Sequence, residues 1–187
     1  MGKLDGKKIA ILATDGVEQV ELTEPRKALE EAGAQTDLVS LEAGEIQAFD
    51  HLDHGDKLRV DKTLDDVSAD DYDGLLIPGG VANGDFLRAD ADVLKFTAAI
   101  AEAHKPIASI CHGPWVLVET GIVKGRTITS WPSLKTDVEN AGGTWVDEEV
   151  HVDQGIVSSR KPDDLPAFCA KVVEELAEGV HRRRQAA

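Results

Sequence analysis

A cysteine at the end of an apolar segment is the residue best suited to covalent chemistry in this chain. Cys111 directly follows the apolar run Ile107–Ile110 and directly precedes His112. The small residues Ser109 and Gly113 lie two positions before and two positions after the thiol. A nucleophile elbow, in which a strand turns sharply into a helix, needs small neighbours there and holds its nucleophile exposed. The spacing therefore predicts a nucleophile, although a cysteine that is merely buried at a strand end shares this pattern.

Other polar groups are placed to assist such a thiol. N–H groups at the start of the following helix would stabilise a thiolate, lower its pKa and bind an oxyanion. His112 either exchanges a proton with Cys111 or only lines the elbow. Glu18 and Glu21 are three residues apart, so on a helix they share one face. A carboxyl group there could hydrogen-bond the thiol or move a proton, and the alternative is an acidic residue that only favours a helix N-terminus.

Three further patterns carry weaker signals. Gly79 and Gly80 end another apolar segment, where paired glycines let the backbone approach a ligand and aim an N–H group at it, or simply form a turn. Their spacing matches no nucleotide-binding motif. The run Asp50–His54 favours a solvated hairpin turn over a metal site, so neither a metal nor another cofactor is expected. Cys169 falls on the apolar side of a helical segment, which predicts a core residue.

The elements around these residues alternate between strand and helix. Hydrophobic patterning predicts strands at 8–13, 36–41, 73–77, 107–110, 150–152 and 156–158, a hairpin over 44–61, and helices at 18–31, 90–104, 113–120, 133–141 and 163–178. This order predicts an α/β fold with a mainly parallel sheet and helices on both faces. Ligands bind beyond the carboxyl ends of such strands, where the loops after Ala13, Ile77 and Ile110 should meet.

Length and composition narrow the functional class. The 187 residues suit a single domain, expected at 1–180, followed by a basic tail at 181–187 that is expected to be disordered. With 20 Lys and Arg against 35 Asp and Glu, the net charge of −15 disfavours nucleic-acid binding through a basic surface. No apolar run approaches the roughly 20 residues that span a bilayer, and no signal peptide is evident. Two cysteines suit a reducing compartment, so a cytoplasmic protein is expected.

Longer stretches resemble the DJ-1/PfpI superfamily, and most of all its PfpI branch of intracellular cysteine peptidase-like and general stress proteins. The similarity is carried by LIPGG at 76–80, CHGP at 111–114, NAGG at 140–143 and VSSR at 157–160. The resemblance implies a flavodoxin-like three-layer sandwich in which Cys111 is the reactive cysteine and His112 assists it. It also implies that Glu21 hydrogen-bonds the thiol and that Glu18 is a further acidic position near the site.

The resemblance also implies self-association. Members of this branch often take a third acid from a neighbouring subunit, and Asp85 is the candidate here, so a dimer or hexamer is expected. Trp131 stands where some relatives have a tyrosine, and an indole cannot supply a phenolic proton. Trp115 and Trp131 are both expected to line the pocket.

The implied activity is glyoxalase III-like hydration of methylglyoxal to lactate, or deglycase action on glycated groups, through a hemithioacetal at Cys111. An intracellular cysteine peptidase is one alternative. Another is a non-enzymatic redox sensor or chaperone in which Cys111 oxidises to the sulfinic acid. Glu149 and His151 would suit a class I amidotransferase, but Trp115 stands where that pattern requires glutamine.

Overall fold

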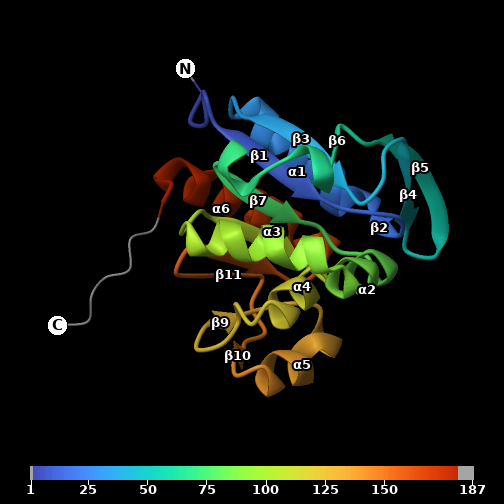
Figure 1. Cartoon of the computed structure of the whole chain (residues 1–187). Helices are drawn as coiled ribbons and strands as arrows, with labels where there is room; N and C mark the ends of the chain where they lie inside the picture. The colour runs from blue at the N-terminus through green and yellow to red at the C-terminus, as the bar shows by residue number, and fades with distance from the viewer. Residues whose placement is uncertain (1, 181–187) are drawn as a thin grey trace.

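A seven-stranded sheet forms the centre of the computed structural model, which describes residues 2–180 (Figure 1). Neighbouring strands in the sheet are parallel, except that β11 runs antiparallel to β12. The strands, in their order across the sheet, are β11 (Val150–Asp153), β12 (Ile156–Ser159), β8 (Ile107–Ile110), β7 (Gly74–Ile77), β1 (Lys8–Leu12), β3 (Gln35–Ser40) and β6 (Lys62–Thr63). The mainly parallel α/β sheet predicted from the sequence is confirmed. The predicted tail at 181–187 lies outside the described residues.

Helices cover both faces of this sheet and make the fold a three-layer sandwich. The longer helices are α1 (Gln19–Glu31), α3 (Ala91–Glu102) and α6 (Leu165–Glu178), and the shorter ones are α2 (Val81–Ala89), α4 (Pro114–Glu119) and α5 (Lys135–Asn140). No helix within residues 2–180 is long and apolar enough to cross a membrane.

Two hydrophobic cores follow from the alternation of side chains along the central strands. Ile9 and Ile11 of β1 belong to the core that includes side chains of α1 and α6. Ala10 and Leu12 of the same strand belong to the core that includes side chains of α3 and α4. Successive strand residues point to opposite faces, so a strand covered on both sides must be apolar throughout. The unbroken apolar sequence of β1 has this origin.

A hairpin projects from the body of the sandwich beside α2 (Figure 1). It consists of β4 (Glu45–Asp50) and β5 (Asp53–Arg59), which pair antiparallel as the sequence predicted. A two-residue strand, β2 (Val17–Glu18), joins the hairpin by pairing parallel with β4. This pairing was not predicted, and it ties the hairpin to the segment from which α1 begins.

Helix α2 was also missed, because its sequence contains the turn-forming pair Asn83 and Gly84. Tertiary contacts override that local preference. Asn83 is fully buried, accepts the N–H of Thr14 at 2.8 Å and donates to the carbonyl groups of Pro78 and Gly79 at 3.1 Å. The asparagine thereby links the loops that follow β1 and β7.

The remaining elements within residues 2–180 are two short strands and four 3-10 turns. The two strands pair parallel, and the turns precede α5 and α6 and connect β6 to β7. These elements are β9 (Thr127–Ile128), β10 (Thr144–Trp145) and the turns Leu64–Asp66, Ala69–Asp71, Pro132–Leu134 and Pro162–Asp164.

Candidate functional site

Cys111 occupies a strained elbow between β8 and α4. Its backbone has a φ of 60°, in the left-handed region that side chains with a Cβ rarely adopt. Its N–H donates to the carbonyl of Ser159 at 3.1 Å, and its own carbonyl accepts the N–H of Trp131 at 2.9 Å. A Cβ added at Gly113 would collide with the hydroxyl of Ser109, so the small residues make this turn possible. Strain of this kind is typical of functional positions.

His112 is positioned to accept a proton from the thiol. Its Nδ1 lies 3.2 Å from Sγ of Cys111. Burial lowers the pKa of His112 to about 4, so the imidazole is neutral near pH 7. Trp131 stacks on the ring at a centroid distance of 5.9 Å, and Trp115 meets it edge-on at 5.1 Å. With its proton on Nε2, the neutral ring offers Nδ1 as a base to the sulfur.

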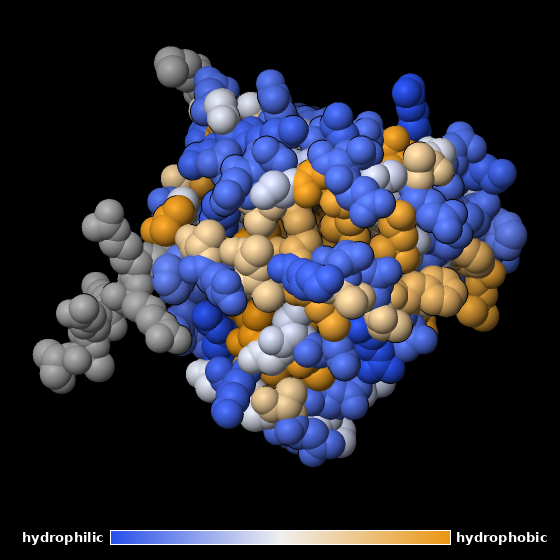
Figure 2. All heavy atoms as spheres, in the orientation of Figure 1, coloured by the Kyte–Doolittle hydropathy of each residue, from blue (hydrophilic) through white to orange (hydrophobic). Residues whose placement is uncertain are grey.

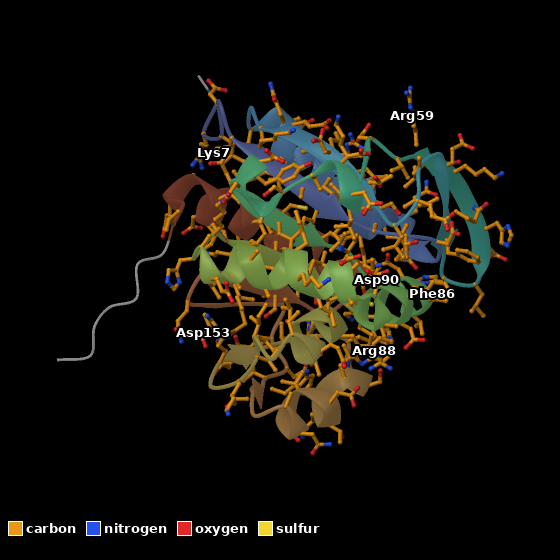
Figure 3. All side chains as sticks on the ribbon, in the orientation of Figure 1. Lys7, Arg59, Phe86, Arg88, Asp90 and Asp153 are labelled. Carbon is orange, nitrogen blue, oxygen red and sulfur yellow. The ribbon has the colours of Figure 1, made fainter. Side chains whose placement is uncertain are left out.

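Trp115 does not line the cavity over the thiol, contrary to expectation. Its indole is held by Asp137 and Arg88. Its Nε1 donates to Asp137 at 2.8 Å, and the guanidinium of Arg88 lies 4.5 Å from the centroid of its ring. Arg88, on the side of α2 that faces α4 and α5 (Figure 3), is in turn paired with Asp85 at 2.9 Å. Asp85 therefore faces a residue of its own helix, and its suggested role in a neighbouring subunit stays a prediction.

Glu21 is a completely buried carboxyl group beside the thiol. Its Oε2 accepts the N–H of Gly79 at 2.9 Å. The carboxyl group also makes a hydrogen bond with the Cys111 thiol, as the resemblance implied. Burial raises the pKa of Glu21 to about 8, and the charge of Glu18 raises it as well. A Cβ at Gly79 would collide with both the Glu21 carboxyl and Cys111, so the absence of a side chain lets these groups approach. Near pH 7, Glu21 is mainly a carboxylic acid that can donate a proton.

Burial also raises the pKa of the Cys111 thiol, and a charge on Glu21 raises it further. The N–H groups of Gly80 and His112 act in the opposite direction but do not offset the burial. The expectation of a thiol with a lowered pKa is therefore wrong. The resting sulfur is a protonated thiol that needs a base.

The start of α4 explains this difference. The helix has only six residues. The N–H of Gly113 donates to the carbonyl of Ile110 at 2.9 Å, and that of Trp115 donates to the carbonyl of His112 at 3.2 Å. Pro114 has no N–H group. The N–H groups expected to stabilise a thiolate are thus engaged elsewhere or missing, apart from that of His112.

A cavity of about 380 Å³ lies over the thiol, and Cys111, His112 and Glu21 all line it. The residues that line it come from six separate segments: Gly16, Glu18, Glu21, Phe49, His51, Leu52, Gly80, Val81, Ala82, Cys111, His112, Trp131 and Pro162. The hairpin contribution was not foreseen, because it depends on contacts distant in sequence: the pairing of β2 with β4 and the hydrogen bonds of Gln47 with Asp15 and Gly16. The exposed apolar residues Leu52, Val81 and Trp131 line this cavity. On the face shown in Figure 2, hydrophobic residues spread across the middle of the molecule among hydrophilic ones.

Two other candidates lie apart from this cavity. Cys169 packs partly buried against the core, as predicted, and burial raises its pKa to about 11. Both cysteines are free. His151 pairs with Glu148 at 2.7 Å rather than with Glu149, and none of the three lines the cavity. The amidotransferase interpretation therefore gains no support.

Comparison with known proteins places this site in a family. The sequence profile of the DJ-1/PfpI family matches residues 7–175. The chain belongs to the DJ-1/PfpI family. A similar member is "Putative cysteine protease YraA" of Bacillus subtilis, 48% identical over 87% of this chain and 94% of that protein. "Deglycase TK1284" of Thermococcus kodakarensis is 40% identical over 90% of this chain and 99% of that protein.

Solved structures of the DJ-1/PfpI family have the same fold. The crystal structure of DJ-1beta from Drosophila melanogaster superimposes with a TM-score of 0.84 at 26% identity, covering 95% of this chain and 91% of that one. The relatives have been named for two different reactions, so membership of the family does not choose between them.

Proposed function

We propose that this chain is a cysteine-dependent enzyme that acts on small reactive carbonyl compounds, with hydration of methylglyoxal to lactate as its reaction. The observation that carries the proposal is the 3.2 Å contact between the Cys111 thiol and the neutral His112 imidazole in a cavity. A thiol beside a base is the arrangement that activates sulfur for addition to a carbonyl carbon. The deglycase name of the Thermococcus relative supports carbonyl chemistry.

The first step is addition of sulfur to the aldehyde carbon. As the S–C bond forms, the thiol proton passes to Nδ1 of His112 and the carbonyl electron pair moves to oxygen. Glu21 is mainly protonated near pH 7, so it can supply the proton that turns this oxygen into a hydroxyl group. The product is a hemithioacetal on Cys111, and Glu21 is left as the carboxylate.

The second step moves a proton between two carbons. The sulfur-bearing carbon loses its proton and the adjacent ketone carbon gains one, with the His112–Glu21 pair as acid and base, so that a lactoyl thioester results. Water then attacks the thioester, the S–C bond breaks, and lactate leaves as the thiol recovers its proton. Methylglyoxal and one water equal one lactic acid, so the reaction needs no external oxidant or reductant.

The raised pKa of Cys111 weighs against the redox-sensor alternative. Peroxide oxidises thiolates, and burial keeps this thiol protonated.

Turnover by matched cysteine variants tests the proposal. Methylglyoxal loss and lactate appearance are followed with wild type, Cys111→Ser and Cys169→Ser. We expect Cys111→Ser to lose activity by at least a thousandfold and Cys169→Ser to retain it, because only Cys111 lines the cavity over His112. Peptide cleavage by the wild type without lactate formation would instead favour the peptidase alternative.

A further inference from the structure

Two carboxylates and an imidazole meet at the wall of the cavity, although Glu18 is far in sequence from the adjacent residues Asp50 and His51. Glu18 ends β2, Asp50 ends β4 and His51 begins the hairpin turn. One ligand atom from each side chain can be chosen so that all three lie within 4.8 Å of one another. The β2–β4 pairing, in which Glu18 lies opposite Phe49, sets this arrangement.

Among the described residues, the carboxyl groups at this position are not paired with a lysine or an arginine. Glu18 is only 8% exposed and Glu21 is fully buried, and both line the cavity. Within residues 2–180, no ion pair forms between a lysine or arginine and Glu18, Glu21 or Asp50. Burying an ionised carboxylate without a cationic partner costs several kcal/mol, so a cation bound beside Glu18 would stabilise its charged form.

We propose that Glu18, Asp50 and His51 bind a divalent metal ion of the zinc class at the wall of this cavity. Imidazole nitrogen and carboxylate oxygen are ligands that zinc accepts together. Three protein ligands leave a coordination position open, as in catalytic zinc sites. Glu18 and His51 line the cavity, so that position is available to a water molecule or to an oxygen of a bound compound.

The backbone of the hairpin turn orients the Glu18 carboxylate toward His51. His51 has a φ of 56°, and its N–H donates to Oε2 of Glu18 at 3.2 Å and to Oε1 at 3.4 Å. A carboxylate has about four lone-pair sites, so this contact leaves acceptor capacity for an ion. The N–H holds the carboxylate next to the imidazole of the same residue, which is how a supporting contact fixes a metal ligand.

The same turn supplies matched controls. Asp53 and His54 repeat the residue types of Asp50 and His51 three positions later but do not belong to the group. His54 instead packs edge-on against Phe49 at 4.9 Å. Asparagine is a suitable replacement for both histidines, because it tolerates the left-handed backbone of position 51.

Zinc binding by the full chain tests the proposal without any substrate, so it stands or falls separately from the proposed reaction. The chain is treated with a chelator, dialysed and titrated with Zn²⁺ in a calorimeter. We expect one ion per chain for the wild type, with affinity reduced at least tenfold in Asp50→Asn and His51→Asn. Asp53→Asn and His54→Asn should bind as the wild type does. Zn²⁺ should also raise the melting temperature of the wild type.

A further variant tests whether zinc binding depends on the Cys111 thiol. Cys111→Ser should keep the wild-type zinc affinity, because Cys111 does not belong to the group. Loss of binding in Cys111→Ser, equal affinity in all hairpin variants, or no binding by the wild type would each overturn the proposal.

Discussion

The buried carboxyl group of Glu21 should make the protein less stable as pH rises. Its pKa of about 8 in the folded chain compares with an ordinary value of 4.5. Between these values the folded chain keeps a proton that the unfolded chain has lost. The free energy of unfolding therefore falls with rising pH, by about 1.4 kcal/mol for each pH unit. From pH 5 to pH 8 this one group removes up to about 4 kcal/mol, a large part of a typical domain's stability.

Glu21→Gln isolates this effect, because an amide of the same shape does not titrate. It can still accept the N–H of Gly79, and the other groups that act on position 21, Glu18 and Cys111, are unchanged. The variant should be close to wild type in stability at pH 5 and more stable at pH 8. Below pH 5, Glu21 becomes protonated in the unfolded chain as well as in the folded chain. The variant should therefore be no more stable than the wild type there.

Urea unfolding of both proteins at pH 5, 6, 7 and 8, in the presence of a chelator, measures the difference. Glu45→Gln, which removes an exposed carboxyl on β4, controls for net charge. A gap between Glu21→Gln and wild type that stays constant over this range would refute the argument, since it would mean that Glu21 is ionised in the folded chain throughout.

Three further outcomes are expected. Methylglyoxal turnover (kcat/KM) should fall below about pH 4 as His112 gains a proton and above about pH 8 as Glu21 loses one, and a pH–rate profile measures this. Trp115→Phe removes the hydrogen bond to Asp137 and weakens the contact with Arg88, so the free energy of unfolding should fall by about 1–2 kcal/mol. Steady-state kinetics of this variant should show a fall in kcat that is larger than the change in KM. Sedimentation at micromolar concentration should give a dimer or larger species, and a 20.1 kDa monomer would contradict this.

Local sequence patterns were sufficient for the elbow and for six of the seven strands of the central sheet, but not for the two-residue edge strand β6. The strands of the central sheet are apolar because helices cover both faces, and that property is visible in a short window of sequence. The elbow at Cys111 depends on small residues within two positions of the thiol, so its spacing also could be read locally. Both features therefore leave a signature in a short stretch of sequence, although distant residues complete them.

Features that depend on distant contacts were not predicted. The run Asp50–His54 is an exposed turn, as predicted. What was missed is that the pairing of β2 with β4 and the hydrogen bonds to Asp15, Gly16 and Gln19 bring this hairpin to the cavity wall. Helix α2 forms against its local propensity because Asn83 is buried between two loops. The raised pKa of Cys111 comes from burial that no local pattern encodes, together with N–H groups of α4 that are already engaged.

Trapping the covalent intermediate tests the central claim, that Cys111 adds to the carbonyl carbon, most directly. The protein is mixed with isotopically labelled methylglyoxal, quenched in acid within the first turnover, and mapped by peptide mass spectrometry. The account predicts a mass increase equal to one methylglyoxal on the peptide containing Cys111, because the hemithioacetal and the lactoyl thioester are isomers. Lactate formation with the label on Cys169, or with neither cysteine labelled, would contradict it.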